Sequence, residues 1–70
     1  MTNLTMTRIL KGVTQGELAR AVDISPAMIS RLEHGLLRDS PAVRELKRKV
    51  SVALSVPVET LFPPESNPHA

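Results

Sequence analysis

The sequence predicts an all-α domain of four to five helices. Helix-start signals recur along the chain. Ser25-Pro26 and Ser40-Pro41 each place a capping hydroxyl before a proline whose φ is already helical, and Thr14 forms a capping box with Glu17. Between these starts, apolar residues recur at spacings of three and four, the period of one buried helix face. No segment alternates as a strand does, so we expect no sheet.

Length and composition limit the chain to one small domain. Its 70 residues are 41% hydrophobic, which supplies one core. No apolar run approaches the roughly 18 residues that cross a membrane. The amino-terminal residues lack a basic segment followed by a continuous apolar stretch, so we expect no secretory signal and a cytoplasmic protein. There are no cysteines, and the two histidines, His34 and His69, are too few for a cluster, so we expect neither metal nor cofactor.

The expected helices follow from the start signals and their stops. The first begins at the N-cap Asn3 and ends at Lys11, before Gly12. The second covers about 14–22 and the third about 25–34.

Glycine and proline residues set the boundaries of the remaining expected helices. Gly35 ends the third helix, and the fourth runs from Ser40-Pro41 to about Ser55 because Pro57 cannot continue it. Residues 58–62 add one turn. The domain therefore spans 1–62, and the Pro-rich residues 63–70 form a flexible tail.

Each helix is expected to bury one face, with Ile24 in the turn between the second and third filling the core. The inward residues are Leu18, Ala19, Val22, Ile29, Leu32, Val43, Leu46, Val50, Ala53 and Leu54. Leu36 and Leu37, which follow Gly35, are either core caps or an exposed apolar patch.

The charge distribution favours an anionic partner. The formal net charge is only +2, yet residues 1–58 hold all 9 Lys and Arg against 5 acids. Phe62 is the only aromatic residue, so the basic region lacks the stacking side chains that RNA and single strands require. Duplex DNA is therefore the expected nucleic acid. The run Lys47-Arg48-Lys49 is interpreted as a solvated helix face, with a contact to DNA backbone as the alternative.

The third helix has the side chains needed to lie in a major groove. Ile29 and Leu32 point inward, whereas the opposite side carries Pro26, Ala27, Ser30, Arg31 and His34. Small residues let the backbone approach base edges, and the Arg31 guanidinium can donate two hydrogen bonds to guanine.

The residues T-Q-x-E-L-A at 14–19, followed by I-S-x-x-x-I-S-x-x-E-x-G at 24–35, resemble the phage-repressor helix-turn-helix family of the Cro and lambda-repressor (XRE-like) type. The resemblance extends from Leu4 to Phe62. It implies a lambda-repressor-like fold of five helices that binds operator DNA as a dimer.

The resemblance also implies roles for individual residues. It places Pro26, Ala27, Ser30 and Arg31 at base-facing and adjacent positions and Gln15 at a phosphate. Thr14, Ser25 and His34 are also expected near phosphates, with a solvated side chain as the alternative for His34. The resemblance implies that Arg8 and Glu33 form a structural ion pair between the first and third helices. Pro26 and Ala27 stand where many relatives carry hydrogen-bonding side chains, so readout there is expected to be apolar, for example of a thymine methyl group.

The sequence favours a regulator and leaves one alternative. No nucleophile has a base at a motif spacing and no phosphate loop is present, so we expect a non-enzyme without a small-molecule ligand. A sequence-specific DNA-binding regulator, either a repressor or an activator, is the first hypothesis, and a repressor acting as a dimer on a palindromic operator is the favoured form. An antitoxin-like or other protein-interaction module on the same fold, with a protein partner, is the alternative. The dimer interface is expected at the apolar patch of Val56, Val58, Leu61 and Phe62.

Overall fold

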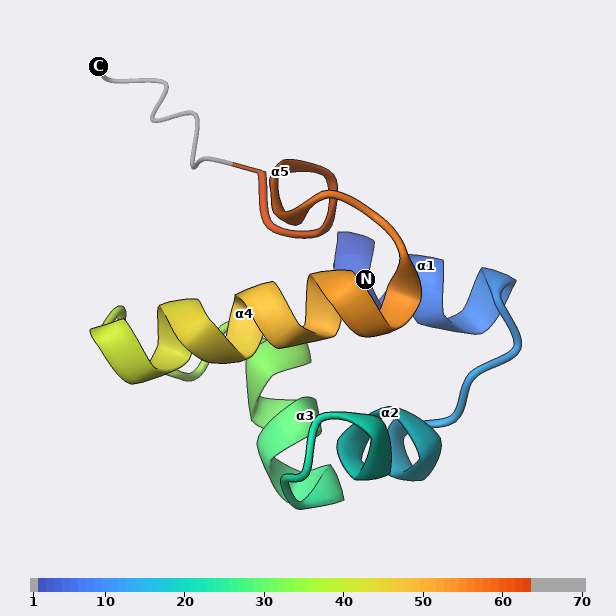
Figure 1. Cartoon of the computed structure of the whole chain (residues 1–70), viewed down its shortest axis with the longest axis horizontal. Coiled ribbons are helices and arrows are strands. Elements are labelled where there is room, and N and C mark those ends of the chain that lie inside the picture. Colours follow the sequence, from blue (N-terminus) through green and yellow to red (C-terminus); the bar gives the residue numbers. More distant parts are fainter. Residues whose placement is uncertain (1, 64–70) are drawn as a thin grey trace.

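The computed structural model describes residues 2–63, which form five α-helices and no strand (Figure 1). The helices are α1 (Asn3–Leu10), α2 (Gln15–Ala21), α3 (Pro26–Glu33), α4 (Pro41–Leu54) and α5 (Val58–Leu61). Helix α4 lies along the long axis of the molecule, with α2 and α3 on one side and α5 on the other (Figure 1). The all-α fold is thus confirmed; residues 64–70 of the expected tail lie outside the described residues.

Three of the predicted helix starts are confirmed by their hydrogen bonds. The hydroxyl of Thr14 accepts from the Glu17 N–H at 3.0 Å while the Glu17 carboxylate accepts from the Thr14 N–H at 3.0 Å. Ser25 caps α3 and Ser40 caps α4 in the same way, each followed by proline. These bonds satisfy backbone donors that a helix cannot pair internally.

The predicted cap of the first helix is wrong by one residue. Thr2, not Asn3, has the extended backbone of an N-cap, and its hydroxyl accepts from the Thr5 N–H at 3.2 Å. Asn3 is already helical, and its amide nitrogen donates to the carbonyl of Thr60 at 3.1 Å, which ties α1 to α5. The helices also end one residue earlier than expected, with Lys11, Val22, His34 and Ser55 as C-caps.

The core is formed by buried residues from all five helices. They are Leu4, Leu18, Ala19, Val22, Ile29, Leu32, Leu46, Val50, Leu54 and Leu61. Ile24 and Leu37 pack against this core, whereas Leu36 is 71% exposed, so the two leucines after Gly35 have different environments.

Two expectations about individual apolar residues are wrong. Ala53 was expected inside but is exposed. Only one face of α4 packs against the rest of the protein, and Ala53 lies outside that face. Leu61 was expected on a surface patch but is only 2% exposed, because α5 folds back against α1 and α4 and inserts this side chain into the core. No helix within residues 2–63 is long and apolar enough to cross a membrane.

Candidate nucleic-acid interface

Helices α2 and α3 form one packed unit connected by a tight turn. Asp23 takes a positive φ of 60° there, and the Ile24 N–H donates to the Ala19 carbonyl at 2.9 Å. Aspartate tolerates this left-handed conformation better than most residues. The turn brings Ser25 into position to start α3 directly beside the end of α2.

The outer face of α3 is free within the described residues. Pro26, Ala27 and Arg31 are exposed and Ser30 is half-buried, whereas Ile29 on the opposite face is 0% exposed. Of the four residues expected to face bases, three are therefore exposed at the surface and Ser30 is partly covered. The exposed residues at the start of the helix, Pro26 and Ala27, are small, and Arg31 is the long side chain of this face.

His34 closes the carboxyl end of this face. Its Nδ1 lies 2.7 Å from the carbonyl oxygen of Ser30. A carbonyl oxygen only accepts hydrogen bonds, so Nδ1 carries the proton and Nε2 is the ring nitrogen left for other partners.

Glu33 joins three segments of the fold behind the α3 face. Its Oε2 accepts from the Nε of Arg8 at 2.5 Å, and its Oε1 accepts from the Nε2 of Gln15 at 2.7 Å. A terminal nitrogen of Arg8 also donates to the Val13 carbonyl at 2.8 Å. Glu33 is 2% exposed, and every buried side-chain N or O atom in the described part of the chain has a partner.

The sequence indicated only part of this network. The Arg8–Glu33 pair was implied by the family resemblance, but the bond from Gln15 to Glu33 was missed. Gln15 and Glu33 lie 18 positions apart on different helices, and no local spacing signals such a contact. Gln15, expected at a phosphate, is half-buried, with one face toward Glu33.

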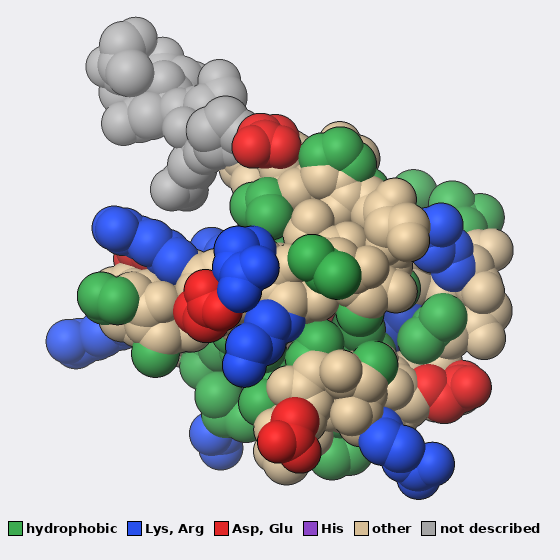
Figure 2. Space-filling model, in the orientation of Figure 1, with side chains coloured by type: hydrophobic (Ala, Val, Ile, Leu, Met, Phe, Trp, Pro, Cys, Tyr) green, Lys and Arg blue, Asp and Glu red, His purple; other side chains and the backbone are tan. Residues whose placement is uncertain are grey.

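Two of the basic side chains form ion pairs with acidic residues at the surface. Arg44 pairs with Asp39 and Arg48 with Glu45, and these hydrogen bonds lower the pKa of both carboxyls and raise the pKa of both arginines. Acidic side chains therefore lie among the basic ones over α4 (Figure 2). Several exposed cations have no ion pair within residues 2–63: Lys11, Arg20, Arg31, Arg38 and Lys49.

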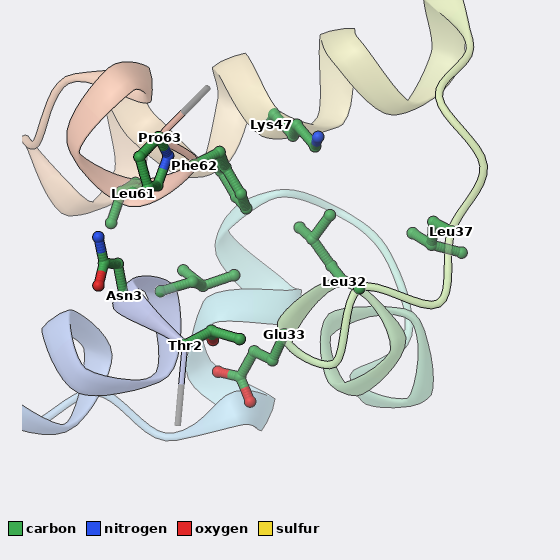
Figure 3. Close-up of a pocket in the computed structure, with 11 residues that line it drawn as sticks. Thr2, Asn3, Leu32, Glu33, Leu37, Lys47, Leu61, Phe62 and Pro63 are labelled. Atoms are coloured by element: carbon green, nitrogen blue, oxygen red, sulfur yellow. The ribbon is translucent and has the colours of Figure 1, made fainter. Parts of the chain in front are cut away.

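A groove of about 480 Å³ lies between α1, the end of α3, α4 and α5 (Figure 3). Leu4, Leu32 and Leu61 contribute apolar atoms, and the Lys47 ammonium lies 5.1 Å from the centre of the Phe62 ring. The expected dimer patch borders this groove only in part. Val56, Val58 and Phe62 are half-buried, and Leu61 is not available at the surface.

Comparison with known families identifies the type of domain. The chain matches the family model HTH_3, described as "Helix-turn-helix", over residues 4–61. The match covers most of the chain, so this protein belongs to that family and is an XRE-type helix-turn-helix DNA-binding regulator. Neither the curated proteins nor the solved structures gave a match.

Proposed function

We propose that this protein is a repressor that binds a palindromic operator as a homodimer. The observation that carries the proposal is the α3 face, which is exposed at Pro26, Ala27 and Arg31 in a chain of a DNA-binding family. Arg31 would read a guanine, Ser30 an adjacent base edge, and the two apolar residues a thymine methyl group. Repression requires only that the protein occupy the promoter, whereas activation needs a further contact with polymerase.

The phosphate contacts in this proposal flank the base-facing residues. Thr14 and Gln15 lie at the amino end of α2, Ser25 caps α3, and His34 is the C-cap of α3. Contacts of this kind place the protein on the duplex without reading sequence.

The proposed dimer follows from the size of the reading surface. Helix α3 has 8 residues and one long base-reading donor, so one copy specifies only a few base pairs. Two copies on half-sites one helical turn apart, about 34–36 Å, double the specified sequence.

Binding to duplexes from the protein's own locus tests the proposal. We expect specific binding at low salt that weakens steeply as salt rises, because each neutralised phosphate releases counterions. A reporter downstream of the bound site should fall in expression. The absence of binding to any such fragment at low salt would overturn the regulator hypothesis, and a rise in reporter expression would overturn the repressor role alone.

A second candidate function is favoured by the outer face of α1. Met6, Ile9 and Leu10 are 47%, 53% and 83% exposed, and their spacing places them on one side of the helix. An apolar face of this kind suits a protein partner, as in an antitoxin-like module. Leu10→Asp should abolish capture of such a partner and leave binding to duplex DNA intact. If the same variant loses DNA binding instead, the face belongs to the regulator's own function.

A further inference from the structure

Glu33 accepts a hydrogen bond from Gln15 in addition to its ion pair with Arg8. It is the only buried charged residue among those described, and the Arg8 guanidinium already neutralises it at 2.5 Å. Its second oxygen nevertheless accepts from the side chain of Gln15 at 2.7 Å. The same carboxylate thus holds α1 through one oxygen and α2 through the other.

This second bond decides which way the Gln15 amide points. A carboxylate only accepts hydrogen bonds, so the NH₂ end of the amide must face Glu33 and its carbonyl oxygen must face away. The amide nitrogen carries two hydrogens, and Glu33 uses one. The other remains for a second acceptor, and Gln15 is only half-buried.

We propose that Glu33 is a positioning residue for DNA binding: it holds the Gln15 amide so that its second N–H donates to a phosphate oxygen. The inference rests on the proposed function, in which Gln15 contacts the DNA backbone. Glu33 is the last residue of α3, two positions after Arg31. The bond therefore also fixes the distance between the phosphate contact on α2 and the base-reading side chain on α3.

The substitution Glu33→Gln removes the acceptor that holds the Gln15 amide and keeps an acceptor for Arg8. A glutamine at this position can still accept from Arg8 through its carbonyl oxygen, because the guanidinium is the stronger donor. Its NH₂ group then faces Gln15, and two NH₂ groups cannot bond, so the Gln15 amide turns over. Its carbonyl oxygen then faces position 33, and its N–H groups no longer lie where Glu33 held them. Glu45→Gln is the matched control, since it removes the same charge from an exposed ion pair on α4.

Operator affinity should be measured for the wild type, Glu33→Gln, Gln15→Ala, the double variant and Glu45→Gln, at a temperature where melts show every protein folded. We expect Gln15→Ala and Glu33→Gln each to weaken binding about tenfold, the size of a hydrogen bond to a charged group. The double variant should be no weaker than Gln15→Ala alone, and Glu45→Gln should not weaken binding.

The outcomes distinguish this inference from the proposed function. No operator binding by the wild type contradicts the proposed function itself. Wild-type binding with an unaffected Gln15→Ala overturns the positioning role while DNA binding stands. An equal loss from Glu33→Gln with and without Gln15 shows a structural role only, which also overturns it.

A measurement on the wild type applies even if Glu33→Gln does not fold. The two side-chain NH₂ protons of Gln15 give separate NMR signals. On addition of operator DNA, the proton bonded to Glu33 should keep its shift and the other should move. Movement of the first signal toward that of a solvated amide would overturn the proposal.

Discussion

The Nε atom of Arg8 lies 2.5 Å from Oε2 of Glu33 and joins α1 to the last residue of α3. The two side chains are 13% and 2% exposed, so the pair is largely withdrawn from water. A buried pair contributes little net stability compared with apolar packing, but loss of one partner leaves the other charge desolvated.

Glu33→Ala is therefore expected to destabilise the fold by about 3–5 kcal/mol without changing which base pairs are preferred. A domain of this size has a total stability on the order of 5 kcal/mol, so the variant should be close to unfolding. Urea and thermal melts measure the effect. Glu45→Ala, which breaks an exposed pair, serves as control and should melt like the wild type. A wild-type melt for Glu33→Ala would show that the pair does not stabilise the protein.

Arg31→Ala should cost about 1–3 kcal/mol of operator binding and relax the preference at one base pair, as expected for a guanine contact. Gln15→Ala should weaken all sites evenly, because a phosphate contact carries no sequence information. Affinities for operators substituted at each position measure both effects. Equal losses across all sequences from Arg31→Ala would exclude it as a base-reading residue.

Ser25 and Ser40 offer a matched pair of cap substitutions. Each caps a helix that begins with proline, through hydrogen bonds of 3.3 and 3.2 Å. Both serine-to-alanine changes should lower the free energy of unfolding by about 1 kcal/mol. Only Ser25→Ala should also weaken DNA binding of the folded protein, because Ser25 lies at the start of α3. An equal loss of affinity from Ser40→Ala would mean that the effect comes from stability alone.

The capping box at α2 predicts a dependence of stability on acid pH. The hydrogen bond from the Thr14 backbone N–H lowers the pKa of Glu17 in the folded state. A lowered folded pKa stabilises the native state above the ordinary glutamate pKa, and this contribution is lost as the pH falls through the folded value. Glu17→Gln keeps a capping side chain that does not titrate, so its melting temperature should fall less below pH 4.5 than that of the wild type. Parallel curves for the two proteins would contradict this assignment.

Local signals in the sequence determined most of the fold and less of the site. The caps at Thr14, Ser25 and Ser40 were predictable because each depends on residues at most three positions apart. The inward positions of Leu18 and Ile29 followed from helical periodicity. Burial of Leu61 was not predictable, because it depends on how α5 packs against distant helices. The bond from Gln15 to Glu33 was missed for the same reason: it exists only once α2 and α3 are packed.

Because Leu61 is buried, the proposed dimer interface has to be tested at another residue of the apolar patch. Aspartate at Leu61 would unfold the core, and Phe62 packs on the core as well, so neither substitution reports on an interface. Val58 is half-buried and is not among the apolar residues that pack against the core. It is also the first residue of α5, where aspartate suits a helix start. Val58→Asp is therefore the substitution best suited to test the interface.

Sedimentation of the free protein should show a dimer for the wild type and a monomer for Val58→Asp with an unchanged melt. Leu10→Asp alters the 83% exposed residue on α1 and is the matched control, expected to remain dimeric. The reverse result, a monomeric Leu10→Asp and a dimeric Val58→Asp, would place the interface on α1. A wild type that stays monomeric at all concentrations, with and without operator DNA, would contradict the dimer itself. In that case the apolar surfaces of α1 and α5 would have to be explained by a different protein partner.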